Sequence, residues 1–330
     1  MIVMQEAKDL SMISGRLKGL VEAVKSKKIL TLIIEPTAKC DLACSFCSMH
    51  NGDFPTEDSK IDMSLETWGI VLDSIKSVPY KFNNIGFHGY GEPLLNKNIY
   101  RMLEDVRPYC ETLKIITNGT ALNLSNHRRL LDSGVDEVHV SLDVADRESF
   151  KKIKEKDQYE RVLKNTIDGS ALYSDSGTSQ LFIKISLLSP NLEDFWGEGR
   201  SGKLSDYENA LQKLGPLFRE NKRVHLKVMP LFTAYNGHEK YVDEKPCEMP
   251  FYMAKIKSTG FVDACCIAMY DELSLGHISE NRLDLHDRLT DIRKAQLSGN
   301  VSQSIPMCGS CGAKTVVDVM EVKEELISLL

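Results

Sequence analysis

The sequence predicts an α/β protein whose larger part is an open, partial (β/α)6 barrel. Apolar bursts alternate with helical patterns six times between residues 29 and 229. Polar residues also recur on one face of successive strands. Repeated β-then-α units favour parallel strands joined by right-handed crossovers. Six units are too few for a closed barrel of eight strands, so we expect an open barrel with a free inner face. A doubly wound sheet is the alternative.

The expected elements follow in chain order. Ser64 is a suitable N-cap for the first helix of the repeat, and Gly134 is a suitable residue to stop the third. The expected strands are 29–36, 85–88, 113–117, 137–142, 181–187 and 224–229. The expected helices are 64–78, 99–106, 125–133, about 147–172 and about 204–219, with a helical lead-in before residue 28.

Alternation along three of these strands predicts a polar inner face. His139 and Ser141 alternate with apolar residues, as do Lys184 in the next strand and His225 and Lys227 in the last. Parallel strands that are buried on both faces are nearly all apolar. We therefore expect an inner face that holds a charged cofactor and a polar substrate, because βα folds place their sites at the carboxyl ends of strands. A sheet with one solvated face is the alternative.

Composition excludes several classes of function. The chain has 330 residues and a net charge of −6, which gives no basic field for nucleic acid. No stretch resembles a signal peptide or a membrane span, so we expect a cytoplasmic protein with no membrane partner. Cytoplasmic thiols stay reduced, so nine cysteines, eight of them clustered, indicate metal binding and not disulfides.

The first cysteine cluster directly follows the first expected strand. Cys40, Cys44 and Cys47 lie within eight residues. Three thiolates can bind three corners of a 4Fe–4S cluster, which leaves the fourth iron open, as a catalytic site requires. A zinc knuckle or three inert cysteines are the alternatives.

This spacing, with Phe46 before the last cysteine, resembles the signature of the radical S-adenosylmethionine (SAM) superfamily. The resemblance implies that the open iron chelates SAM. The turn Gly89-Tyr-Gly91-Glu92-Pro93 resembles the Gly-Gly-Glu-Pro motif of that family, with Tyr90 in place of the first glycine of the motif. The resemblance also implies that SAM contacts two further strand-end motifs, through Asn118 and Ser141.

A second set of cysteines lies in the last quarter of the chain. Its order resembles the SPASM domain of radical SAM enzymes in its short form, the twitch domain. This resemblance implies one auxiliary 4Fe–4S cluster, with a four-cysteine zinc site as the alternative and Cys266 as a possible replacement for one ligand. The implied ligands are Cys247, Cys265, Cys308 and Cys311. We expect three regions: a lead-in (1–28), a radical SAM core (29–233) and an auxiliary-cluster domain (234–330), which ends in a helix over 315–330.

The resemblance implies reductive cleavage of SAM to a 5′-deoxyadenosyl radical, with flavodoxin or ferredoxin as a typical electron donor. Residues 87–98 and the cysteine spacing of the last domain resemble those of twitch-domain dehydrogenases that oxidise a hydroxyl of an aminocyclitol. We therefore expect oxidation of a hydroxyl-bearing carbon of a small polar metabolite, with the auxiliary cluster accepting the second electron. His88, His225 and Lys227 are candidates for the base. Peptide modification, epimerisation and a non-enzymatic iron–sulfur sensor are the alternatives.

Overall fold

A computed structural model of the chain describes the larger part of its length. The described residues are 10–45, 47, 49–50, 60–173, 177–187, 204–218, 221–230, 246–268, 271–309, 311 and 319–330. Phe46 and the expected domain boundary at residue 233 lie outside the described residues.

One sheet of nine strands runs through the described part of the chain, in the order β6-β5-β4-β3-β2-β1-β7-β8-β9. The first six strands are parallel, and each pairs with the strand before it in sequence, as the expected barrel requires. The bounds are β1 Thr31–Ile34, β2 Phe82–Phe87, β3 Cys110–Thr117, β4 Glu137–Ser141, β5 Gln180–Leu187, β6 Val224–Pro230, β7 Met253–Ile256, β8 Phe261–Asp263 and β9 Ser274–His277.

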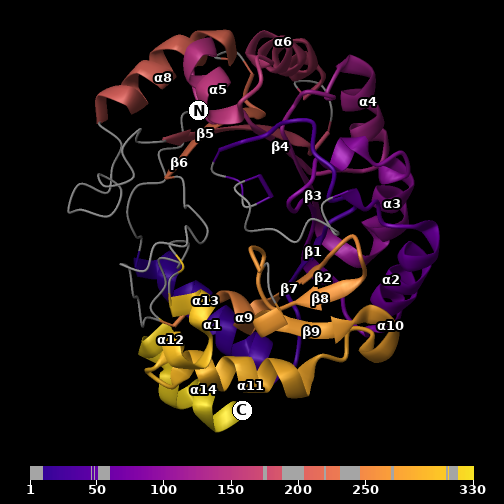
Figure 1. Cartoon of the computed structure of the whole chain (residues 1–330), viewed down its shortest axis with the longest axis vertical. Helices are drawn as coiled ribbons and strands as arrows, with labels where there is room; N and C mark the ends of the chain where they lie inside the picture. The colour runs from indigo at the N-terminus through magenta and orange to yellow at the C-terminus, as the bar shows by residue number, and fades with distance from the viewer. Residues whose placement is uncertain are drawn as a thin grey trace.

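Helices cover the outside of the strand arc, as Figure 1 shows for α2, α3, α4 and α6. The bounds are α1 Leu10–Lys25, α2 Leu65–Ser77, α3 Ile99–Val106, α4 Leu124–Asp132, α5 Arg147–Lys154, α6 Tyr159–Ser170, α8 Leu204–Phe218, α9 Met249–Tyr252, α10 Ile278–Asn281, α11 His286–Leu297, α12 Val301–Ser304, α13 Pro306–Gly309 and α14 Lys323–Leu329. The short 3-10 turns are Pro93–Leu95, Arg107–Tyr109, Ala171–Tyr173, Asp271–Leu273 and Val319–Val322.

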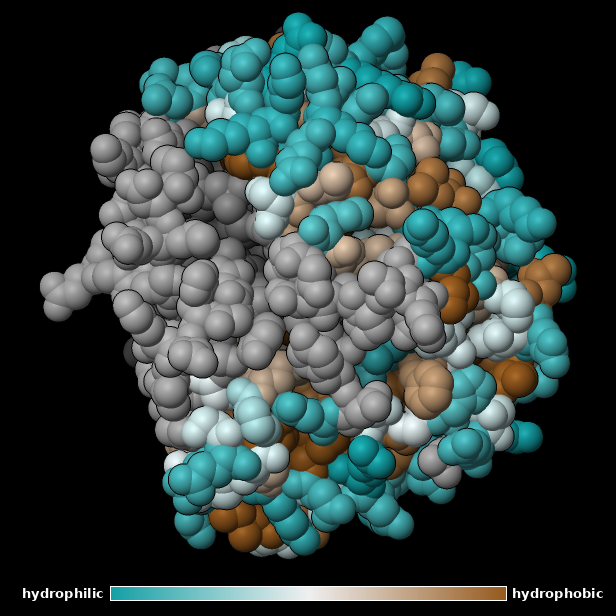
Figure 2. All heavy atoms as spheres, in the orientation of Figure 1, coloured by the Kyte–Doolittle hydropathy of each residue, from teal (hydrophilic) through white to brown (hydrophobic). Residues whose placement is uncertain are grey.

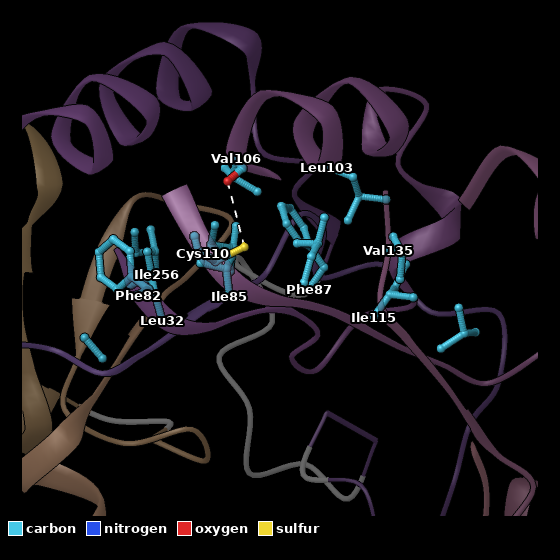
Figure 3. Close-up of a cluster of buried hydrophobic side chains, with 14 of the residues drawn as sticks. Leu32, Phe82, Ile85, Phe87, Leu103, Val106, Cys110, Ile115, Val135 and Ile256 are labelled. Carbon is cyan, nitrogen blue, oxygen red and sulfur yellow. Dashed lines mark hydrogen bonds between the residues drawn. The ribbon is translucent and has the colours of Figure 1, made fainter. Parts of the chain in front are cut away.

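The main core lies between this arc and its helices (Figure 3). Leu32, Ile85 and Ile115 face the helices from three neighbouring strands, and all three are fully buried. Cys110 joins this core, where its thiol contacts the carbonyl oxygen of Val106 at 3.9 Å. Cys110 is therefore on the outer, helix-covered side of the sheet.

The N-cap expected at Ser64 is confirmed. Its hydroxyl accepts a hydrogen bond from the backbone N–H of Thr67 at 3.0 Å, which satisfies one free donor of the first turn of α2. Trp68, on the same helix, donates from Nε1 to Asp105 Oδ2 at 2.9 Å and so joins α2 to α3. These contacts fix the outer layer beside β2.

The C-terminal segment adds three strands to the sheet, which the sequence did not predict. β7 pairs in parallel with β1, from Thr31 opposite Met253 to Ile34 opposite Ile256. β8 and β9 then continue the sheet in antiparallel fashion. β1 therefore lies in the interior of the sheet, between a strand of its own repeat and a strand that follows more than two hundred residues later.

Two helical expectations need correction. The helix expected over 147–172 is two helices, because Glu155 adopts φ +53° and ends α5 in the left-handed conformation. No helix was expected between residue 234 and the closing helix, but α11 spans 12 residues. Its buried side includes Arg293 and Gln296, and these two polar residues hide the apolar period. Of the closing helix, residues 323–329 are α14, and 315–318 lie outside the described residues.

Among the described helices, none is both long enough and apolar enough to cross a membrane. The rim over α5, α6 and α8 is mostly hydrophilic in the view of Figure 2, where it lies at the top.

Replacing Leu32 with Ala tests the central position of β1. Leu32 is fully buried, and leucine-to-alanine changes in such positions cost about 2–5 kcal/mol of unfolding free energy. Leu65→Ala is the matched control, because Leu65 is 47% exposed, and it should cost less than about 0.5 kcal/mol. Urea denaturation measures both; equal losses would contradict the buried position of β1.

Candidate active site

The first cysteine loop begins where β1 ends and packs against the end of α5. The backbone N–H groups of Ala43 and Ser45 donate to the carbonyl oxygens of Lys154 and Ile153, at 3.2 and 2.9 Å. Lys156 also donates from Nζ to the carbonyl oxygen of Asp41 at 2.6 Å. The loop is therefore fixed by a helix that follows it by more than one hundred residues.

The three thiols of this loop lie within electrostatic reach of one another. Burial raises the pKa of Cys40 and of Cys44 to about 11, and it raises the pKa of Cys47 as well. Nearby thiols raise these pKa values further, while the Lys154 ammonium lowers those of Cys44 and Cys47. Three half-buried thiols beside a cation form a donor set that fits an anionic iron–sulfur cluster.

No three His, Cys, Asp or Glu side chains of the described residues converge tightly enough to hold a single metal ion. A 4Fe–4S cluster does not require such convergence, because each of its thiolates binds a different iron.

Asp41 ties the cysteine loop to the turn after β3. Asn118 donates from Nδ2 to Asp41 Oδ1 at 2.7 Å, and it also lies 3.7 Å from Cys40 Sγ. Thr120 donates from its hydroxyl to the second oxygen, Asp41 Oδ2, at 2.6 Å. Asn118, expected on resemblance to contact SAM, is thus placed directly beside a cysteine of the loop.

Glu92 is a buried carboxylate at the same place. It accepts hydrogen bonds from the Thr117 hydroxyl at 2.7 Å, the Asn118 N–H at 2.6 Å and the Leu94 N–H at 3.0 Å. Burial raises its pKa to about 7, although these hydrogen bonds act in the opposite direction. Glu92 therefore joins the turns after β2 and β3.

The turn that carries Glu92 approaches the cysteine loop closely. A Cβ on Gly91 would lie 2.1 Å from the carbonyl oxygen of Thr37, so only glycine fits there. A Cβ on Gly89 would lie 2.2 Å from Glu35 Oε2. Pro93 begins the 3-10 turn that Glu92 caps. These glycines let the second strand-end turn lie against the first.

Tyr90, which replaces the first glycine of the family motif, links this turn to the C-terminal segment. Its backbone N–H donates to Glu35 Oε2 at 2.8 Å, and its hydroxyl donates to the carbonyl oxygen of Ile267 at 2.7 Å. Lys255 of β7 lies 4.2 Å from the centre of the Tyr90 ring and 3.3 Å from Glu35 Oε2. Ile267 directly follows Cys265 and Cys266, so Tyr90 connects the surroundings of the two cysteine sets.

Asp143, after β4, forms a buried ion pair with Lys154. Asp143 adopts φ +68°, a strained conformation for aspartate that surrounding contacts must maintain. Its N–H donates to the carbonyl oxygen of Lys184 at 2.9 Å. The pair therefore holds the end of α5, on which the cysteine loop packs.

The inner face, defined as the face of β3–β6 turned away from the helices, carries the expected polar side chains. Ser141 lies opposite Lys184, which lies opposite Lys227. His139 lies two residues before Ser141 on β4, and His225 lies two residues before Lys227 on β6. For the described side chains, the apolar partners of this alternation are buried on the other face, as expected.

Burial shifts all three candidate bases toward the neutral form. Burial lowers the pKa of His88 to about 3, with the charges of Lys184, Lys255 and Lys114 acting in the same direction. Burial also lowers the pKa values of His225 and of Lys227. All three changes favour the neutral form, which is the form that accepts a proton.

The auxiliary cysteines are brought together by Gln296 of α11. Gln296 Oε1 accepts a hydrogen bond from the Cys247 N–H at 2.8 Å, and its Nε2 lies 3.2 Å from Cys308 Sγ. Burial raises the pKa of Cys247, and the neighbouring thiols contribute. These neighbours are Cys311, Cys308 and Cys266. Cys265 hydrogen-bonds to Cys266, so all five thiols lie in one region.

Several residues of this site were not singled out from the sequence. Asp41 and Thr120 bond directly to Asn118, which was expected in the site. Their position beside motif residues is the only sequence signal for them. Glu35 gave no such signal, because a lone carboxylate at the end of a strand matches no motif. Lys154, which pairs with Asp143, lies in what was expected to be the middle of a helix.

The sequence model of the radical SAM superfamily matches residues 34–168. This segment is a radical SAM domain. It includes the cysteine loop and the turns that carry Glu92, Asn118 and Ser141. A radical SAM domain uses a 4Fe–4S cluster and SAM, so the expectation of these two cofactors is confirmed.

Curated relatives match about half of the chain or less. "Probable GTP 3′,8-cyclase" of Methanocaldococcus jannaschii is 31% identical over 170 residues, which are 51% of this chain and 53% of that protein. A GTP 3′,8-cyclase of Chlorobaculum tepidum is 34% identical over 133 residues, 40% of this chain and 38% of that protein. The chain thus spans about half of the first relative and less of the second.

Solved structures share the fold over most of the chain. BtrN, in complex with AdoMet and 2-DOIA, has a TM-score of 0.53 at 17% identity and covers 88% of this chain and 95% of its own. SuiB of Streptococcus suis, bound to the precursor peptide SuiA, has a TM-score of 0.56 at 17% identity, with coverages of 97% and 80%. The expected α/β fold, an open parallel barrel with a C-terminal extension, is confirmed.

Replacing Lys154 with Met tests the buried ion pair beneath the radical SAM domain's cysteine loop. Loss of one partner leaves Asp143 buried without its cation, which costs about 3–5 kcal/mol of unfolding free energy. Lys164→Met is the matched control, because Lys164 pairs with Asp168 on an exposed helix surface and should cost no more than about 0.5 kcal/mol. Thermal and urea unfolding measure both; similar losses would show that the Asp143–Lys154 pair is unimportant.

Proposed function

We propose that this radical SAM enzyme oxidises a hydroxyl-bearing carbon of a small polar metabolite. The observation that carries the proposal is the convergence of Cys40, Cys44 and Cys47 beside Asn118 and Glu92, above a polar inner face. Bound there, the 4Fe–4S cluster supplies an electron that cleaves SAM to methionine and a 5′-deoxyadenosyl radical. Flavodoxin or ferredoxin is the proposed electron donor.

The chain's own residues bind and orient the reactants. Cys40, Cys44 and Cys47 hold the cluster, and the SAM contacts are Phe46, Gly89, Gly91, Glu92, Pro93, Asn118 and Ser141. The inner face then holds the target carbon near the radical, because hydrogen abstraction requires the two carbons to be close together. His88, His225 or Lys227 accepts the hydroxyl proton, and their lowered pKa values support this role.

Oxidation of an alcohol to a ketone removes two electrons and two protons. One hydrogen atom goes to the 5′-deoxyadenosyl radical, the hydroxyl proton goes to the base, and one electron remains. Cys247, Cys265, Cys308 and Cys311 would hold an auxiliary 4Fe–4S cluster, which would supply an acceptor for this electron. The shared region of these thiols supports the assignment, as does the Tyr90 hydrogen bond that joins the two sites.

The fold likeness to BtrN, whose structure contains AdoMet and 2-DOIA, supports a small polar substrate. A second candidate is modification of a peptide, because SuiB was solved with a precursor peptide and covers 97% of this chain. Mass spectrometry distinguishes the two candidates: the first predicts a ketone formed from a polyol, and the second predicts a change in the mass of a peptide.

Cys44→Ala tests the cluster loop. The reconstituted variant, reduced with dithionite without oxygen, should release 5′-deoxyadenosine only at the level of iron-free protein, because two thiolates cannot hold the cluster. Cys110→Ala is the control, since Cys110 is buried on the outer side of the sheet. Chromatography of the products measures both; equal cleavage by Cys44→Ala and Cys110→Ala would exclude this site.

Cys247→Ala tests the auxiliary cluster separately. The wild-type protein should contain about eight irons per chain, and the variant about four, because only the first cluster remains. SAM cleavage should persist while ketone formation stops. Iron analysis makes the measurement, and zinc in place of four of the irons would contradict the auxiliary cluster.

A further inference from the structure

We propose that the inner face of β4–β6 binds an anionic group of the substrate, a phosphate or a carboxylate. The residues concerned are Lys184 and Lys227, with His139 and His225 beside them, and we call these four the basic row. The proposal rests on the proposed function, because it takes this face as the one that holds the substrate.

Strand register places the basic row in two levels. Lys184 and Lys227 lie opposite each other on β5 and β6, and at the next level His139, Phe182 and His225 lie side by side on β4, β5 and β6. Neighbouring parallel strands are about 4.8 Å apart, so the two ammonium groups come from adjacent positions. They can therefore contact two oxygens of one anion.

Phe182 orients three of the four residues of the basic row. Its ring stacks on His139 at 4.5 Å and on His225 at 4.9 Å between centroids. The Lys227 ammonium lies 4.0 Å from the centre of the same ring. One aromatic side chain thus orients both imidazoles and one ammonium, as a binding site built before its ligand arrives would require.

Charge on this face is not balanced within the described part of the chain. Glu137, the carboxylate of this region, pairs with Lys114 at 2.9 Å and accepts from His139 Nε2 at 2.8 Å. Asp143 pairs with Lys154. Lys184 and Lys227 have no carboxylate partner among the described residues, so two positive charges remain.

Burial makes this imbalance costly without an anion. Burial lowers the pKa of Lys184 to about 8, and the nearby charges of Lys114 and Lys227 contribute, although Asp143 acts in the opposite direction. His139 is 4% exposed, and its Nδ1 is buried without a hydrogen-bond partner, as is Nδ1 of His225. A bound anion would neutralise the ammonium groups, and a hydroxyl of the same ligand could donate a hydrogen bond to Nδ1 of His139, whose Nε2 donates to Glu137.

The basic row therefore narrows the substrate class. An ammonium group on the substrate would meet two like charges, whereas a phosphorylated or carboxylated polyol would meet two opposite ones. Lys227 must be charged to bind this anion, so the hydroxyl proton goes to His88 or His225.

Anion binding by the reconstituted protein tests the proposal, with inorganic pyrophosphate as the phosphate probe and citrate as the carboxylate probe. Calorimetry at low ionic strength should show that at least one of them binds, since salt screens such contacts. Lys184→Gln and Lys227→Gln should each weaken its binding about tenfold, as expected when a charge-assisted contact is lost. Lys222→Gln is the control, because Lys222 is exposed just before β6, and it should bind as the wild type does.

Three outcomes would overturn the proposal: neither probe binds, Lys227→Gln binds as tightly as Lys222→Gln, or D-glucosamine binds more tightly than both anions. The carboxylate of SAM is an alternative ligand of the basic row. The binding measurement should therefore be repeated with saturating SAM. If the probe no longer binds, the basic row is a site for the SAM carboxylate, and the proposal of a substrate site is overturned.

SAM cleavage in the same preparations separates this proposal from the proposed function. Cleavage without anion binding overturns only the basic row as an anion site. Anion binding without cleavage overturns the radical chemistry of the proposed function. Circular dichroism melting of each variant confirms that it is folded.

Discussion

The buried carboxylate of Glu35 organises the regions around both cysteine sets. It lies directly after β1, accepts the N–H of Tyr90 from the turn after β2 and pairs with Lys255 of β7. It is 2% exposed, so its charge has to be compensated by these fixed partners and not by water. Because Glu35 and these two partners come from three separate parts of the chain, the cysteine loop, the Glu92 turn and the C-terminal strands are correctly placed only together.

The site follows from a general property of parallel strands joined by helices. Their carboxyl ends lie along one edge, so the turns after β1, β2 and β3 meet although they are distant in sequence. Short contacts make this meeting specific: glycine lies where backbones touch, Glu92 joins the turns after β2 and β3, and Asp41 joins the cysteine loop to the turn after β3. The thiols and the polar inner face are thereby held on one rigid frame, as a reactive radical requires.

Sequence reasoning worked where the signal was local. The bounds of α3 and the N-cap of α2 agree with the expectation, because the spacing of apolar residues and the capping of a helix depend on residues close in sequence. The cysteine loop was evident from spacing alone. The pairing of β7 with β1 was missed because a four-residue strand that contains Lys255 has no distinctive pattern, and its partner lies far away. The helix α11 was missed because two polar residues occupy its buried side. Arg293 donates to a backbone carbonyl oxygen, and Gln296 hydrogen-bonds to Cys247 and Cys308.

The interior position of β1 has a consequence for synthesis of the chain on the ribosome. One side of β1 can pair as soon as β2 has emerged, but the other side waits for β7, which begins at Met253. Until then β1 presents an open hydrogen-bonding edge of apolar residues, the kind of surface that promotes aggregation. The nascent protein therefore passes through a long interval in which molecular chaperones have a surface to protect, and the final sheet closes late in translation.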